Sequence, residues 1–447
     1  MNMLQRSSAE RITVVKMPVA THCVRVHHCP SPSPPFDSPL QSSVTRCLAA
    51  ILCLLCVSST SFPASWNSLG SLPDAKPFAG IGAAPGGAVI AVQRGSSLDL
   101  MQLSEGKTTL TRSLPLPHMR LDLCSRRSIG IAAEQVYFCA PRFTRLIFDI
   151  ANGNVRQLPA RVQLNKIAAD LSAANAPDGT TLVATTDVLA LSLWRANHPA
   201  AAFTLAAEFD LLRVRSDGTL LAPSVTYWDD AFHVLVPTRA SAGNSASASR
   251  LHYLSSPDEG HTWQHTTIDN IAVTANQMLS EATIIGSASG LWAAYVLDSA
   301  LYVQRLENGQ GCWSSPHKVG SCHVSHLQGV QAGPRAVLLW VGDCNREVES
   351  WAKLPFADIW SPDRRRIWLN NDVYTLTLNP DTDRQSDPQR LTDHLSYTDS
   401  LVALGMPQGL FVLRTGRRKV GYELDTFGAP AEAFWLWIAQ SSIDAGR

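Results

Sequence analysis

The sequence predicts an all-β fold, a β-propeller of four-stranded antiparallel blades, on three observations. Short apolar runs of strand length recur from residue 66 onward, and Gly, Asp, Asn or Pro residues bound them. No long stretch of this region repeats with the period of a helix. The runs recur at intervals of roughly 50 to 65 residues, which is the range of a four-stranded blade. Residues 66–447 therefore hold about six blades, with seven as the alternative.

Apolar runs mark the expected blade centres. Each run has the length of a strand, and together they cover residues 87–92, 135–138, 181–185, 232–236, 291–296, 336–341 and 409–413. Dipeptides that tolerate the positive φ angles of tight hairpins recur between them, at Asp178-Gly179, Asp217-Gly218 and Asn308-Gly309. A β-sandwich with attached domains is the alternative fold, because it also consists of many short strands at even spacing.

The composition argues against nucleic-acid binding and favours a β-rich extracellular protein. The 447 residues include 37 basic and 37 acidic side chains, so the formal net charge is zero. The sequence therefore lacks the basic footprint of a nucleic-acid binder. Charged residues make up only 17% of the chain, and the 12 tryptophans favour β-structure.

An apolar segment in the N-terminal region predicts export. Leu48–Val57 is apolar, Arg46 precedes it, and small residues lead to Ala64, as in a secretory signal peptide with its cleavage site. The segment is too short to cross a bilayer comfortably, so we expect no stable transmembrane span. The alternative is a buried apolar stretch, because periodicity alone does not separate the two.

This segment divides the chain into three expected parts. Residues 1–45 are expected to be a disordered leader or an incorrectly assigned start. Residues 46–64 are expected to be a signal peptide, and residues 66–447 a single propeller domain of a secreted, periplasmic or extracellular protein.

Cleavage near Ala64 leaves half of the ten cysteines. Cys124 and Cys139 flank one strand-like stretch, and Cys312 and Cys322 flank another. Each pair is therefore positioned to staple neighbouring strands in an oxidising compartment, with Cys344 left over. Reduced buried thiols are the alternative, because a sequence does not specify connectivity.

The most specific local pattern is the octapeptide from Ser256 to Trp263, Ser-Pro-Asp-Glu-Gly-His-Thr-Trp. The short carboxylate of Asp258 is expected to accept hydrogen bonds from amides of its own turn. Gly260 is expected to take a backbone conformation that other residues resist, and Trp263 to cover the turn with apolar surface. Thr262 is a β-branched residue at the start of the returning strand.

This octapeptide resembles the Asp-box, or bacterial neuraminidase repeat, found in sialidases and other propellers. The positions that carry the resemblance are Ser256, Asp258, Gly260, Thr262 and Trp263. In that family the box caps the hairpin between the third and fourth strands of a blade, on the face away from the active site. The resemblance therefore implies a propeller and gives these residues a structural role.

A sialidase also needs an arginine clamp and a tyrosine nucleophile. In the family that the octapeptide resembles, arginines hold the substrate carboxylate, a tyrosine paired with a glutamate is the nucleophile, and an aspartate is the acid/base. The stretch Leu395–Leu401 is similar to the context of that nucleophile, which makes Tyr397 the candidate. The alternative is an ordinary tyrosine at a strand edge.

The rest of the catalytic set does not follow the family pattern. The Tyr/Phe-Arg-Ile-Pro motif that precedes the first Asp-box in sialidases is missing from the sequence. Glu347 and Glu349 alternate along a strand-like segment and would face the same side, where a solvated surface is the alternative. Some arginines are possible members of a clamp, but no motif or spacing in the sequence singles them out: Arg142, Arg145, Arg335 and Arg414.

Other chemistries find little support. His323 and His326 have a spacing seen in some metal sites, but the sequence offers no third ligand at a telling distance. It also has no nucleophile elbow, phosphate loop or dinucleotide fingerprint. We therefore expect no cofactor and no metal.

Two functions fit this sequence. The first is a non-catalytic or divergent sialidase-like propeller that binds a glycan or a cell-surface protein. The alternative is an exo-sialidase-type glycoside hydrolase that cleaves terminal sialic acids with Tyr397 as nucleophile. A third possibility is action on another polysaccharide, with Trp228, Trp292 and Trp340 among its stacking platforms, although core packing is the alternative role of these tryptophans.

Overall fold

A computed structural model describes residues 66–445, with interruptions of which the longest are 116–129, 159–170, 344–371 and 419–430. The chain divides into two compact units, Met1–Thr60 and Ser61–Arg447, and every described residue belongs to the second. The expected leader (1–45) and signal peptide (46–64) lie outside the described residues.

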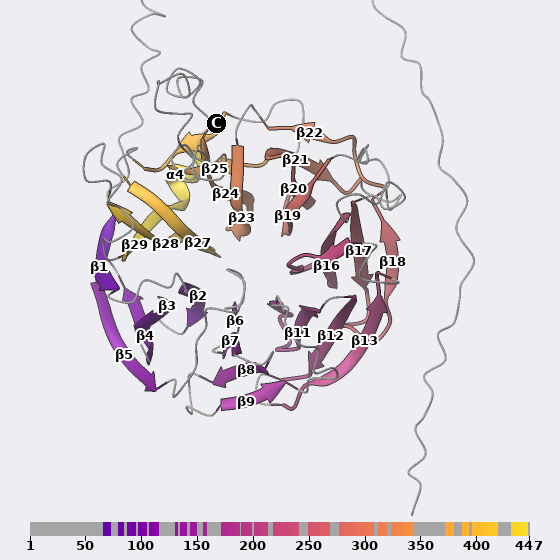
Figure 1. Cartoon of the computed structure of the whole chain (residues 1–447), viewed down its shortest axis with the longest axis horizontal. Coiled ribbons are helices and arrows are strands. Elements are labelled where there is room, and N and C mark those ends of the chain that lie inside the picture. Colours follow the sequence, from indigo (N-terminus) through magenta and orange to yellow (C-terminus); the bar gives the residue numbers. More distant parts are fainter. Residues whose placement is uncertain are drawn as a thin grey trace, which may run out of the picture. The chain divides into compact units, whose positions relative to one another are not determined.

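The described residues form seven antiparallel sheets, which we call sheets I to VII (Figure 1). Sheet I contains β2 (Ala79–Ala84), β3 (Gly87–Arg94), β4 (Ser97–Ser104) and β5 (Lys107–Pro115). Sheet II contains β6 (Gly130–Ala132), β7 (Gln135–Ala140), β8 (Thr144–Asp149) and β9 (Val155–Leu158). Sheet III contains β10 (Leu171–Asn175), β11 (Thr181–Thr186), β12 (Ala190–Ala196) and β13 (Thr204–Asp210).

The remaining sheets follow the same order. Sheet IV contains β14 (Gly218–Leu220), β15 (Ser224–Trp228), β16 (Ala231–Ala240), β17 (Arg250–Ser256) and β18 (Gln264–Thr267). Sheet V contains β19 (Leu279–Ser287), β20 (Gly290–Leu297), β21 (Ala300–Arg305) and β22 (His317–Lys318). Sheet VI contains β23 (His323–Ala332), β24 (Arg335–Asp343), β25 (Asp372–Thr377) and β26 (Gln389–Arg390). Sheet VII contains β27 (Ser396–Met406), β28 (Gly409–Arg418), β29 (Ala431–Ala439) and β1 (Asn67–Leu72).

The sheets close into a ring through their inner strands, which are β2, β6, β10, β15, β19, β23 and β27. Each inner strand contacts the next one along the chain, and β27 contacts β2 (Figure 1). This arrangement confirms the predicted β-propeller of four-stranded antiparallel blades, with β14 as a short additional strand in sheet IV. Seven sheets lie within the described residues, where the sequence predicted six blades with seven as the alternative.

The predicted apolar runs are the second strands of the sheets: β3, β7, β11, β16, β20, β24 and β28. The reason is burial on both faces. All positions of β20 are buried because sheets IV and VI pack against its two sides, whereas no position of the outer strand β18 is buried. A strand that is covered on both faces is a continuous apolar run rather than an alternating one.

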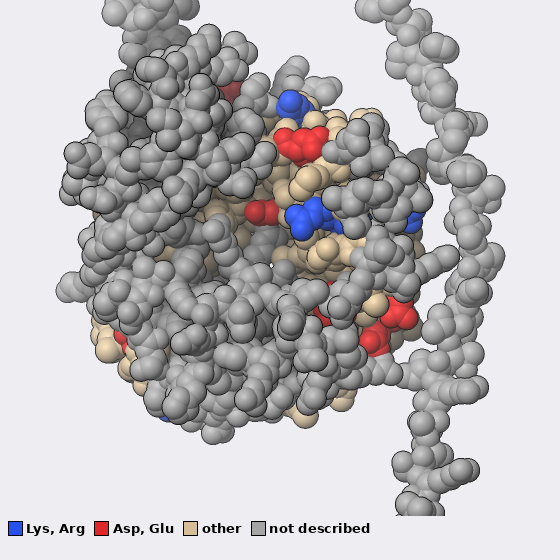
Figure 2. All heavy atoms as spheres, in the orientation of Figure 1, with Lys and Arg blue, Asp and Glu red and all other residues tan. Residues whose placement is uncertain are grey.

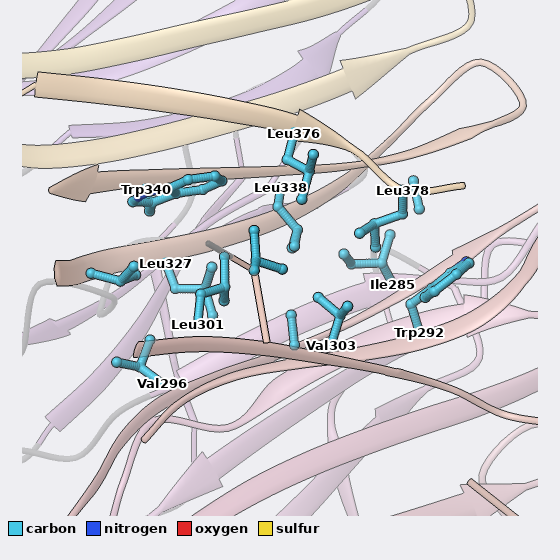
Figure 3. Packing of buried hydrophobic residues seen from close by; sticks show 14 of the residues in the cluster. Ile285, Trp292, Val296, Leu301, Val303, Leu327, Leu338, Trp340, Leu376 and Leu378 are labelled. Carbon is cyan, nitrogen blue, oxygen red and sulfur yellow. The ribbon is translucent and has the colours of Figure 1, made fainter. Parts of the chain in front are cut away.

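Apolar side chains interdigitate between neighbouring sheets. Figure 3 shows this between sheets V and VI, where Leu301 and Val303 lie near Leu338 and Leu376. Full burial of a side chain of this size contributes about 1.5 to 3 kcal/mol. Trp292 and Trp340 are fully buried, so they pack in the core and are not platforms for a sugar.

The two ends of the propeller domain meet in sheet VII. The strand β1 pairs with β29, with Asn67 opposite Trp435, so a strand from before sheet I completes the last sheet. The guanidinium of Arg414, which is 5% exposed, lies 4.6 Å from the ring centroid of Trp66. It also lies 4.8 Å from that of Phe434. Desolvated contacts of this kind contribute about 2 kcal/mol.

The helix described in this part of the chain is short, α4 (Gln440–Ala445). Among the described residues, no helix has the length and apolar character needed to cross a membrane. Each expected cysteine pair has one member outside the described residues, Cys124 or Cys322, and Cys344 lies outside them as well.

Candidate functional site

The ring has two distinct ends. The inner strands β15, β19, β23 and β27 run in the same direction. At their C-terminal ends, the amide of Ala288 donates to the carbonyl of Pro334 (3.2 Å), and that of Gly333 to the carbonyl of Met406 (2.9 Å). We call this end the turn end. It carries the tight turns at 229–230, 288–289, 333–334 and 407–408. We call the opposite end, where the inner strands begin, the start end.

The turn from Ser256 to Trp263 lies at the turn end. It joins β17 to β18, the third and fourth strands of sheet IV counted outward from β15. Ser256 pairs with Phe232, which lies beside the 229–230 turn. The strand order therefore places this turn away from the start end of the ring.

Asp258 organises the turn through its two carboxylate oxygens. Oδ1 accepts hydrogen bonds from the Ser256 hydroxyl and from the Thr262 amide, both at 2.8 Å. Oδ2 accepts a bond of 2.6 Å from the Thr262 hydroxyl. Desolvation raises the pKa of Asp258, but the hydrogen bonds from Thr262 and Ser256 outweigh it and lower the pKa to about 2.

The backbone of the turn needs Gly260. Its φ angle is +92°, in the left-handed region that favours glycine. The Gly260 amide donates to the Ser256 hydroxyl at 2.7 Å, and its carbonyl accepts from the Trp263 indole at 3.1 Å. Trp263 packs against the apolar cluster between sheets III and IV.

The turn also holds the neighbouring sheet. Arg195 of β12 in sheet III donates its Nε–H to the carbonyl of Glu259 at 2.6 Å. One of its terminal nitrogens lies 3.6 Å from the Glu259 carboxylate. Donors of its own turn hold the Asp258 carboxylate, and Arg195 joins the turn to sheet III, so the described contacts of this site are structural.

Polar side chains line the inner strands nearer the start end. Ser172 of β10 accepts a hydrogen bond from the amide of Val225 in β15, at 3.1 Å. Ser224 of β15 in turn accepts one from the amide of Ile284 in β19, at 3.0 Å. Each hydroxyl thus accepts a hydrogen bond from a backbone amide of the next inner strand. Charged side chains also lie near the centre of the ring (Figure 2).

A carboxylate continues the same series. Glu281 of β19 accepts hydrogen bonds from the amides of His326 (2.9 Å) and Leu327 (2.6 Å) in β23. The register of β23 shifts between Ser325 and Gln328, and His326 has a φ angle of +53°. The carboxylate therefore stabilises a β-bulge, a feature that frequently redirects side chains beside functional sites.

Tyr397 is the second residue of β27, opposite Arg417. It thus lies on an inner strand, at the start end. The structure describes this strand but not the Tyr397 side chain.

Of the four candidate clamp arginines, Arg335 and Arg414 are described with their side chains, and they lie in different sheets. Arg414 of β28 is buried against Trp66 and Phe434. Arg335 is the first residue of β24, at the turn end, and Arg145 lies on β8 in sheet II. Arg142, Glu347 and Glu349 lie outside the described residues.

A second cluster, a histidine pair in sheet IV, was not predicted from the sequence. His252 of β17 and His265 of β18 lie on the same face of the hairpin, and their rings are stacked with centroids 5.3 Å apart. Their positions just outside the Ser256–Trp263 turn were a usable signal, because hairpin pairing brings such residues together.

Comparisons with known proteins find structural similarity but no sequence relative. No protein-family model matches the sequence, and no curated protein does. The structure of YCF48 bound to a D1 peptide matches with a TM-score of 0.45 and 12% identity, over 84% of this chain and 95% of that one. The WD40 domain of SCAP from fission yeast gives a TM-score of 0.45 and 10% identity, over 85% and 91%. The GH43 endo-arabinanase from Bacillus licheniformis gives 0.36 and 11%, over 60% and 92%. Similarity at this level assigns neither a family nor an activity.

Proposed function

We propose that this chain is an exported, non-catalytic propeller, divergent from sialidases, that binds a glycan or a protein outside the cell. In this proposal the octapeptide is an Asp-box with a structural role. Its polar atoms bond within the turn, and Arg195 ties the turn to sheet III. Export rests on the apolar segment Leu48–Val57.

The observation that carries this proposal is the placement of Arg335 and Arg414. A clamp for a carboxylate sugar needs guanidinium groups that converge on one point. Arg414 is buried against Trp66 and Phe434, and Arg335 begins β24 at the turn end, whereas Tyr397 lies at the start end. We therefore expect neither arginine to join a clamp beside Tyr397, and we expect the chain to bind a partner without cleaving a sialoside.

The test of catalysis is release of a fluorophore from a sialoside by the purified protein and by Tyr397→Phe. We expect no release above the uncatalysed rate from either. Release by the wild type that Tyr397→Phe abolishes would overturn the proposal.

The test of binding uses fluorescently labelled protein on cultured cells. We expect saturable binding, which enzymatic deglycosylation of the cells removes if the partner is a glycan and mild proteolysis removes if it is a protein. Binding that does not saturate on untreated cells would count against a specific partner.

One observation favours the exo-sialidase as a second candidate. Tyr397 lies on an inner strand and at the start end, opposite to the Ser256–Trp263 turn. In the family that the octapeptide resembles, the nucleophile and the Asp-box also lie on opposite faces. The fluorophore assay separates this candidate from the first.

A further inference from the structure

The histidine pair of sheet IV has the geometry of two metal ligands. Nδ1 of His252 lies 3.1 Å from Nε2 of His265. Two nitrogens bound to one ion at 2.0–2.1 Å are about 2.9 to 3.4 Å apart, for angles from about 90° to the tetrahedral value. The separation of 3.1 Å between the two nitrogens lies within that range.

We propose that His252 and His265 bind a divalent transition-metal ion such as Cu²⁺, Ni²⁺ or Zn²⁺, with water completing its coordination. Imidazole is a suitable ligand for each of these ions. Among the described residues, no group of three or more His, Cys, Asp or Glu side chains is placed to hold a metal. The described residues therefore supply two ligands. This inference is independent of the proposed function.

The Thr238 hydroxyl lies beside the second ring nitrogen of His252. The Thr238 hydroxyl donates to the carbonyl of Arg250 (3.3 Å) and accepts from the Arg250 amide (3.2 Å). It lies 3.5 Å from Nε2 of His252, whose N–H it is placed to accept. A proton on Nε2 leaves the lone pair of Nδ1 directed at His265, and a hydroxyl partner of this kind orients a metal-ligating histidine.

His265 completes the pair from an outer strand. Nε2 of His265 and Nδ1 of His252 share one hydrogen bond. Both nitrogens must present lone pairs to an ion, so on binding the shared proton moves to the other nitrogen of the ring that carries it, and two neutral rings lose no net proton. His265 is exposed, whereas His252 is only 5% exposed. Solvent therefore reaches the pair from one side, where water ligands have room.

A cationic side chain acts on the pair. The positive charge of Arg250 is felt at His252, so it is expected to oppose the approach of a metal ion. Removal of this charge therefore gives a test in which the affinity rises.

The experiment is calorimetric titration of Cu²⁺ into the full chain at pH 7, purified without a histidine tag. His265→Gln removes an exposed ligand without opening the core, and we expect it to weaken this site at least about tenfold. Arg250→Gln removes the opposing charge, and we expect affinity to rise about two- to fourfold. His261→Gln is the matched control, because His261 is an exposed histidine of the adjacent turn.

Electron paramagnetic resonance of the copper-loaded protein gives a readout independent of affinity. The wild type is expected to show coupling to two imidazole nitrogens that His265→Gln reduces, with one ion fewer bound per chain. Equal stoichiometry and affinity in the wild type and His265→Gln would overturn the proposal. An equal loss in His261→Gln would do the same, because it would place the ion elsewhere.

Discussion

Arg195 donates its Nε–H to the carbonyl oxygen of Glu259 at 2.6 Å, so a side chain of sheet III closes over the backbone of a turn in sheet IV. The acceptor is a carbonyl, so the contact depends on the shape of the turn and little on the charge of Glu259. The neighbouring ion pair is longer, at 3.6 Å, and the Glu259 side chain is 48% exposed.

Replacing Arg195 tests this coupling between sheets. Arg195→Met keeps the apolar stem but loses the donor, and we expect the free energy of unfolding to fall by about 1 to 2 kcal/mol. Glu259→Gln is the control and should change stability by less than about 0.5 kcal/mol, because exposed ion pairs contribute little. Urea unfolding measures both, and an equal loss in the two variants would show that the ion pair dominates.

Replacing Asp258 tests the turn itself. Asp258→Ala removes the acceptor of the Thr262 amide and hydroxyl and of the Ser256 hydroxyl. We expect a loss of about 1 to 3 kcal/mol in unfolding free energy. Asp210→Asn, at an exposed position on β13, is the matched control and should unfold like the wild type. If Asp258→Ala left the free energy of unfolding unchanged, the structural role proposed for Asp258 would be wrong.

The pH dependence of stability offers a separate test of Asp258. Its pKa falls from the ordinary 3.8 to about 2 in the folded protein. A lowered carboxyl pKa stabilises the fold above the unfolded-state value, and this stabilisation is lost as the pH falls through the folded-state value. The stability difference between wild type and Asp258→Asn should stay constant from pH 7 to about 5. It should then shrink between about pH 4 and 2. Equilibrium unfolding at several pH values measures it, and a pH-independent difference would contradict the assignment.

The bulge in β23 depends on Glu281. Glu281→Ala removes the acceptor of the His326 and Leu327 amides, and bonds to a charged group contribute about 1.5 to 3 kcal/mol each. We expect hydrogen exchange at these two amides to accelerate at least about tenfold, while the amides of β20 keep their protection. Glu281→Gln keeps one acceptor and should give an intermediate rate. Unchanged exchange in Glu281→Ala would show that the bulge does not need the carboxylate.

The fold followed from the sequence because of how propeller sheets pack. The second strand of each sheet is covered on both faces, so its residues form an uninterrupted apolar run, such as 291–296 in β20. Outer strands such as β18 have little apolar character and gave weaker signals. The number of sheets was harder to predict, because sheet VII takes its outermost strand, β1, from the other end of the domain.

The candidate site followed from the sequence only in part. The turn around Asp258 was predictable because its bonds are local, within Ser256–Trp263. The partners of Arg414 and Glu281 were not, because Trp66 and His326 are far away in the sequence and meet these residues only when the ring closes. The same holds for Arg195, which reaches the turn from a different sheet.

By itself, the sequence determined the β-sheet blades and one well-specified turn, since strand burial and short-range hydrogen bonds depend on neighbouring residues. Only the tertiary structure decided which residues from different strands and sheets lie close together in the ring. It placed Tyr397 and the Ser256–Trp263 turn at opposite ends, buried Arg414 against Trp66 and Phe434, and brought His252 to within 3.1 Å of His265. These relationships depend on strand direction and on the pairing of strands, which a linear pattern of residue types does not contain.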